Sequence, residues 1–145
     1  MRVLYCLLKP VLYRFSSWDA APLRVQAPCF FMTDIGQSTQ YPGRMNSLVV
    51  ILLSNVDMQN GSSIMISNLG WTLTKSGNID IIGDGALSFQ LLGSGSGLMG
   101  KGQWDAEAKT LTLVVASRIP AGTQVNFSFQ LTNPYCAQTS PPVCI

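Results

Sequence analysis

The sequence contains no histidine, and this absence restricts the chemistry that the chain can perform. Histidine is the commonest general base near neutral pH and the commonest metal ligand. Without it, neither a Ser-His-Asp nor a Cys-His catalytic arrangement can be built. The seven acidic residues are scattered, most of them beside turn residues, and no two are placed persuasively as a glycosidase pair. We therefore expect no enzymatic activity, no metal site and no cofactor.

Charge is also scarce. Charged residues make up 11% of the 145 residues and the net charge is +2, whereas a typical globular domain carries about 25% charged residues. No run of lysine and arginine is present to follow phosphates, so nucleic acid is not an expected partner. No apolar stretch approaches the ~20 residues of a transmembrane helix. The surface must therefore be solubilised by uncharged polar residues or by attached groups.

Two sequons for N-glycosylation could supply such groups. One begins at Asn60, in a strong turn signal, and the other at Asn126, on the polar side of a predicted strand. Attached glycans would explain how a surface with so few charges stays soluble. The alternative is that both are plain surface amides, because so short a motif also arises by chance.

The pattern of short apolar runs separated by turn residues predicts an all-β fold. The clearest strand covers residues 123–132, where apolar and polar side chains alternate strictly. About eight to ten such strands at roughly ten-residue spacing favour an antiparallel β-sandwich, immunoglobulin-like or jelly-roll-like. We expect an N-terminal extension over residues 1–21, which holds a candidate donor strand and linker, the sandwich over residues 22–135, and a tail rich in cysteine and proline over residues 136–145.

The predicted core is drawn from the apolar faces of these strands. Residues 47–54 form a continuous apolar run, which suits a central strand covered on both faces. The predicted core residues are Val49, Ile51, Leu53, Ile64, Ile66, Leu111, Leu113, Val125, Phe127, Phe129 and Leu131.

The four cysteines are Cys6, Cys29, Cys136 and Cys144, and none belongs to a C-x-x-C pair. An even count suits disulfides in an oxidising compartment. Four cysteines allow three pairings, and the sequence does not choose among them. We favour a bond between Cys136 and Cys144, because it would fasten a proline-rich tail that has few hydrogen bonds of its own. The alternative is four buried or free thiols.

The apolar N-terminal segment, residues 1–15, requires cover. It begins like a signal peptide, but Lys9 and Pro10 interrupt the run after six apolar residues. Around Arg14 the apolar side chains alternate in the manner of a strand with one face against a core. The segment could fold back on its own domain or enter a neighbouring copy, with residues 16–22 as the connector. The candidate assembly residues are Val3, Leu4, Tyr5, Leu7, Leu8, Val11, Leu12, Tyr13 and Phe15.

Aromatic residues offer a second kind of site. Trp18, Trp71, Trp104 and Tyr41 could form a platform on which sugars stack. The favoured interpretation places Trp71 and Trp104 in the core instead, where an indole contributes a large apolar area.

Acidic side chains could hold a calcium ion through their oxygens at Asp57, Asp80 and Asp84. Their spacing does not match an EF-hand, and turn formation is the better interpretation. The glycine-rich residues 93–97 lack the Gly-Lys-[Ser/Thr] ending of a phosphate-binding loop and indicate a flexible loop.

Several stretches together resemble a known group of domains. They are YPG at residues 41–43, GSSIMISNL at 61–69, GQWD at 102–105, TLTLVVAS at 110–117, and the ending IPAG at 119–122 followed by FSFQLTNP at 127–134. The combination resembles β-sandwich repeats in large secreted and surface proteins of algae and other protists. This resemblance implies an extracellular or cell-surface scaffold without catalytic residues.

We therefore expect a structural subunit of an extracellular filament or surface coat, whose partners are other copies of itself. The alternative is a carbohydrate-binding or adhesion module.

Overall fold

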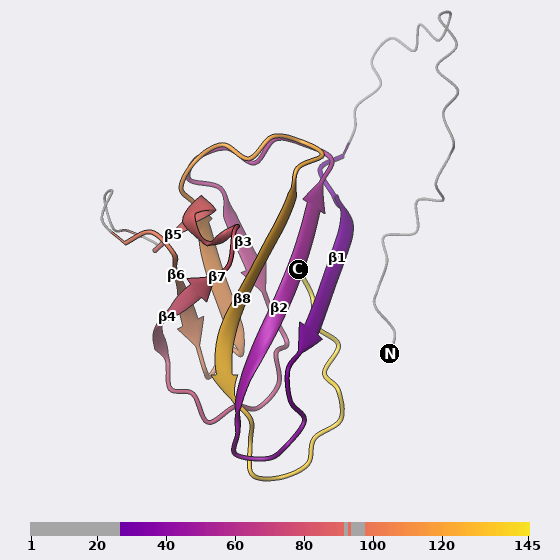
Figure 1. Ribbon diagram of the computed structural model, residues 1–145, viewed down its shortest axis with the longest axis vertical. Helices are drawn as coiled ribbons and strands as arrows, with labels where there is room; N and C mark the ends of the chain where they lie inside the picture. The colour runs from indigo at the N-terminus through magenta and orange to yellow at the C-terminus, as the bar shows by residue number, and fades with distance from the viewer. Residues whose placement is uncertain (1–26, 92, 94–97) are drawn as a thin grey trace, which may run out of the picture.

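The computed structural model describes residues 27–91, 93 and 98–145, and these residues form an all-β domain (Figure 1). The predicted donor segment, Cys6 and Trp18 lie outside the described residues. Within these described ranges a single 3-10 turn, η1 (Ala86–Ser88), interrupts the strands. The strands are β1 (Phe30–Gln37), β2 (Met45–Ser54), β3 (Ser63–Ile66), β4 (Gly77–Ile82), β5 (Phe89–Gln90), β6 (Lys101–Asp105), β7 (Thr110–Val115) and β8 (Gln124–Thr132).

The eight strands form one antiparallel sheet in the order β1-β2-β8-β4-β6-β7-β3, with β5 paired to β7. Strand β4 joins the two halves of this sheet, because Gly77–Asp80 pair with β6 while Ile81 and Ile82 pair with β8. The sheet therefore curls into a half-barrel whose halves face each other across the core (Figure 1). This arrangement confirms the prediction of an antiparallel, sandwich-like all-β fold.

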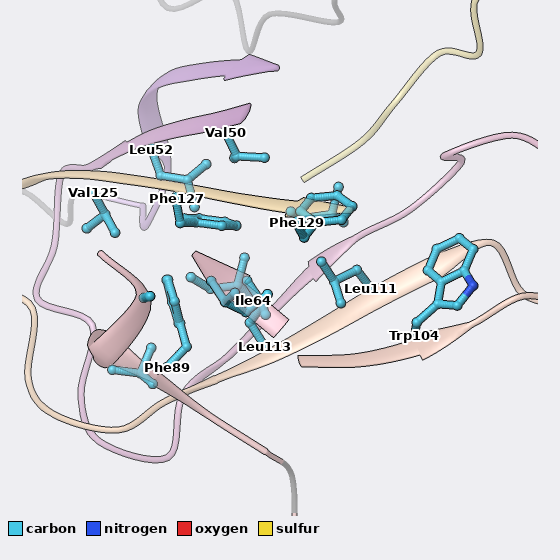
Figure 2. Packing of buried hydrophobic residues seen from close by; sticks show 14 of the residues in the cluster. Val50, Leu52, Ile64, Phe89, Trp104, Leu111, Leu113, Val125, Phe127 and Phe129 are labelled. Atoms are coloured by element: carbon cyan, nitrogen blue, oxygen red, sulfur yellow. The ribbon is translucent and has the colours of Figure 1, made fainter. Parts of the chain in front are cut away.

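The core lies between the two halves of the sheet (Figure 2). Phe89 and Phe127 meet there edge to face, with ring centroids 5.0 Å apart. Burial of each large apolar side chain stabilises the fold by roughly 1.5–3 kcal/mol. Eight of the predicted core residues are buried, namely Ile64, Ile66, Leu111, Leu113, Val125, Phe127, Phe129 and Leu131.

The prediction for β2 is wrong by one residue. Val50 and Leu52 are fully buried, whereas Val49 is 47% exposed, and Ile51 and Leu53 are only half-buried. A continuous apolar run carries no alternation, so the sequence does not show which set of side chains faces the core. Since side chains alternate along a strand, a shift of one residue moves the whole set to the other face.

The C-terminal tail closes back onto the sheet beside β3. The N–H of Ser67 donates to the carbonyl of Cys144 at 2.8 Å, and the N–H of Cys144 donates back at 3.1 Å. Val143 and Ile145 pack against the core. The tail is thus held by main-chain hydrogen bonds and apolar contact.

The disulfide predicted between Cys136 and Cys144 is not present in the structure. Cys29, Cys136 and Cys144 are all free thiols. The backbone bridge to Ser67 holds Cys144 in place, while Cys136 lies on the surface near Trp71. The tail is therefore fastened without a bond between these two cysteines.

Candidate functional site: the β1 edge and the outer stripe

Strand β1 forms one edge of the sheet, and within the described residues it pairs with β2 alone. The N–H of Ser38 donates to the carbonyl of Ser47 at 3.0 Å and continues this pairing beyond the strand. Alternate residues of a strand direct their backbone groups to opposite sides. The register therefore turns the N–H and C=O groups of Thr33, Ile35 and Gln37 away from β2.

The surface beside this edge is apolar. The outer faces of β1 and β2 carry apolar side chains that are half-buried or exposed, and we call these apolar side chains the outer stripe. Asp34 and Gly36 lie next to it on the same face, opposite Ile51 and Val49. The outer stripe consists of Met32, Met45, Val49, Ile51 and Leu53.

The neighbouring strand β8 shows the opposite character on the same outer face. Its inward residues alternate with exposed or half-buried polar ones, as the sequence predicted for this strand. The apolar surface of β1 and β2 therefore does not continue into β8. The outward residues of β8 are Gln124, Asn126, Ser128, Gln130 and Thr132.

A bulge lies at the start of β1. Phe30 is opposite Ser54 and Met32 is opposite Leu53, so Phe31 has no residue opposite it in β2. The Phe31 side chain is 69% exposed. Bulges of this kind are common at sheet edges, where they bend the strand and limit pairing. The regular part of the free edge therefore begins after the bulge.

A second candidate site lies around Trp71. This side chain is 67% exposed, and it lines a shallow depression of about 330 Å³ together with Leu73, Tyr135 and Gln138. Gln138 fixes the Trp71 backbone, accepting from its N–H at 3.0 Å and donating to its carbonyl at 3.1 Å. The Lys109 ammonium lies 3.9 Å from the centroid of the Trp71 ring, close enough for a cation–π contact.

The aromatic residues considered from the sequence do not come together. Trp104 is buried, as predicted, and its indole N–H donates to the carbonyl of Thr74 at 3.1 Å. The core placement of Trp71 is wrong, because Trp71 is exposed. Tyr41 is exposed but does not line the depression. Sequence reasoning missed Tyr135, whose position beside Trp71 depends on how the tail folds back.

Two of the acidic residues considered for calcium are paired with basic side chains instead. The carboxylate of Asp57 accepts from the N–H of Ala121 at 2.9 Å and from Nε of Arg118 at 2.9 Å. Those two hydrogen bonds hold the pKa of Asp57 below its usual value. Asp80 forms an ion pair with Lys101. Among the described residues, no group of three acidic or cysteine side chains is positioned to hold a metal ion.

Both sequons lie on the surface of the described domain. Asn60 is exposed at the turn that precedes β3. Asn126 is exposed on the outer face of β8, where its side-chain oxygen accepts from Nε2 of Gln124 at 3.0 Å. Each asparagine is therefore accessible for a glycan in the folded domain.

No family model, curated protein or solved structure matches the chain. The strands themselves define the class, an antiparallel β-sandwich-like domain. Across the described residues there is no helix long and apolar enough to cross a membrane.

Proposed function

We propose that the protein is a structural subunit of an extracellular filament or surface coat, and that copies assemble head to tail through the N-terminal segment, residues 1–15. The observation that carries this proposal is the free edge of β1 beside the outer stripe. An exposed strand edge is a template for pairing with another chain. An apolar patch beside it favours an occupant with apolar side chains, and the N-terminal segment is rich in them.

Addition of a strand to a sheet edge supplies main-chain hydrogen bonds, while alternate side chains supply specificity. A subunit that gives a strand at one place and receives one at another makes a head-to-tail contact. Such contacts propagate as an open filament unless the rotation between subunits closes a ring. A single small domain could in this way build an extended structure.

The surface location is supported by separate features. The chain carries two exposed sequons at Asn60 and Asn126 and has few charged residues. Its sequence resembles repeats of secreted and surface proteins of algae and other protists, which are scaffold domains. Copies of the chain are then the principal partner, and attached glycans maintain solubility.

Deletion of residues 1–15 tests this proposal. The truncated chain should remain soluble and rich in β-structure, and it should form no filaments when examined by electron microscopy and sedimentation. Its circular dichroism spectrum establishes that the domain still folds. Filaments formed by the truncated chain would contradict assembly through the N-terminal segment.

A second candidate function is carbohydrate binding or adhesion, which the exposed Trp71 favours. Sugar rings stack against exposed aromatic faces, and Tyr135 and Leu73 widen the apolar surface beside Trp71. Trp71→Ala should then abolish retention on insoluble polysaccharide. Tyr41→Ala is the matched control, because Tyr41 is also a largely exposed aromatic residue but lies outside the depression. Equal retention of both variants would contradict this function.

A further inference from the structure

We propose that residues 33–37 of β1 are the acceptor for residues 11–15 of a second copy, paired antiparallel with Arg14 opposite Asp34. This inference rests on the proposed function and identifies the receiving surface and the contact that sets the register. It follows from the backbone of β1, from the charges on its outer face and from the shape of the surface around Gly36.

The backbone of β1 offers an acceptor of the right length. The groups turned away from β2 belong to Thr33, Ile35 and Gln37, which together span five residues after the bulge at Phe31. Residues 11–15 are also five, and they lie between Pro10 and the polar Ser16. Pro10 has no backbone N–H to donate to a neighbouring strand, so the pairing does not continue from residue 11 toward the N-terminus. Every strand pair in the domain is antiparallel, and the added strand continues that pattern.

Charge fixes the register within this edge. Asp34 is exposed in the middle of the free part of β1, and neither ion pair in the described domain involves it. Arg14 is the only charged residue among residues 11–15. Residues directly opposite each other in an antiparallel pair project from the same face and interact. Placing Arg14 opposite Asp34 therefore joins the one charge of the donor to the one charge of the acceptor.

The remaining positions are compatible with this register. Leu12 falls opposite Gly36, where the surface is open, because a Cβ atom added to Gly36 would meet no heavy atom within 4 Å. The exposed Val49 lies opposite Gly36 in β2. A Leu12 side chain at that place would extend the outer stripe. Tyr13 falls opposite Ile35, which packs against the core from the opposite face of the strand. Leu12 and Tyr13 thus meet an open and an apolar position, whereas Phe15 and Val11 fall opposite the polar Thr33 and Gln37.

The chain between the donor segment and β1 is long enough to reach a second copy. Residues 16–29 separate the donor segment from β1 and can span at most about 46–50 Å when extended. A strand of eight residues is only about 27 Å long. The donor segment can therefore leave its own domain and reach the β1 edge of a neighbour.

Charge reversal tests the inference on the full-length chain. The Asp34→Arg variant and the Arg14→Asp variant should each form few filaments alone. The critical concentration for filament assembly should rise roughly tenfold in each. An equimolar mixture of the two should assemble, because each donor then meets an acceptor of opposite charge. Rescue in the mixture requires exchange between copies, since a segment folded onto its own chain would find the same mismatch in the mixture. Glu107→Arg is the control for charge alone, because Glu107 is exposed in the turn between β6 and β7, two strands that do not pair with β1.

The outcomes separate this inference from the proposed function. If deletion of residues 1–15 abolishes filaments but Asp34→Arg assembles normally, the acceptor is not the β1 edge, and assembly through the segment still stands. If the double variant, Arg14→Asp with Asp34→Arg, assembles alone but the mixture does not, the pair forms within one chain and the inference is wrong. Asp34→Asn adds a further measurement. It should weaken assembly, whereas stronger association would show that Asp34 protects the edge and would overturn the inference.

Discussion

Nδ2 of Asn46 donates to Oδ1 of Asn133 at 2.9 Å, joining residues 87 positions apart in the sequence. Asn46 is buried at the start of β2, and its Oδ1 accepts from the backbone N–H groups of Ser38 and Thr39. Nδ2 of Asn133 donates in turn to the carbonyls of Thr39 and Tyr41. The two amides thus hold the loop between β1 and β2 against the end of β8, directly after β1 ends.

Asn46→Ala should lower the free energy of unfolding by about 3 kcal/mol. The substitution removes the partner of several partly buried polar groups, and a buried group left unsatisfied costs about 1–3 kcal/mol. Denaturant unfolding followed by circular dichroism measures the change. Asn78→Ala, at an exposed position in β4, is the control and should change stability by less than about 0.5 kcal/mol. Equal effects of the two substitutions would show that the Asn46 network contributes nothing.

The assignment of the two faces of β2 can be tested with adjacent leucines. Leu52 is fully buried, whereas Leu53 is half-buried on the outer face. Leu52→Ala should cost about 2–5 kcal/mol, the usual range for a deletion that leaves a cavity in a core. Leu53→Ala should cost less than half as much, because the outer face can relax around the smaller side chain. The reverse order in denaturant unfolding would restore the pattern expected from the sequence alone.

Phe127→Ala should lower the free energy of unfolding by about 3–5 kcal/mol. The ring is buried against Phe89 in the middle of the core, so its removal deletes both an edge-to-face contact and a large apolar volume. Phe31→Ala removes the same ring from an exposed bulge and should be nearly neutral. A helical circular dichroism spectrum in the unmodified protein would contradict the fold on which this prediction depends.

The fold class could be predicted from the sequence because the decisive strands alternate. In β8 each apolar residue from Val125 to Leu131 faces the core, as the period of two requires. The face of β2 could not be predicted in the same way, because its apolar run has no period. The buried Asn46 shares a face with Val50 and Leu52, but a polar residue gives no sign from sequence that it is buried.

The candidate sites were less predictable than the fold because they depend on contacts between distant segments. Whether Trp71 is exposed depends on where the C-terminal tail places Gln138 and Tyr135. Position in an edge strand is likewise set by the sheet order, which the sequence of β1 does not contain. The apolar character of the N-terminal segment was visible from the sequence. The position of Asp34 on the outer face of the edge strand was not, because it depends on the register of β1 and β2.

Glycosylation should add mass to the protein isolated from a secretory pathway. Asn60→Gln and Asn126→Gln should each remove one glycan from the intact mass, because both side chains are exposed. Asn78→Gln is the control, since Asn78 is exposed but does not begin a sequon. A mass that equals the bare polypeptide before enzymatic deglycosylation would refute both sites.

Asp57 should make stability depend on pH in the acid range. Its carboxylate accepts from the Ala121 N–H and from Arg118, so its pKa in the folded state lies below the ordinary value of 3.8. The folded state therefore favours the ionised form, and this contribution to stability is fully present well above pH 3.8. This contribution is lost as the pH falls below 3.8 and through the lower pKa of the folded state. At still lower pH the carboxylate is protonated in both the folded and the unfolded state.

The difference in unfolding free energy between the unmodified protein and Asp57→Asn should consequently be constant near neutral pH and shrink below about pH 4. Denaturant unfolding at a series of pH values measures it. Arg118→Gln should weaken this dependence without abolishing it, because the hydrogen bond from Ala121, the largest cause of the lowered pKa, remains. A difference that stays constant through the acid range would show that Asp57 has the same pKa in the folded and unfolded chains.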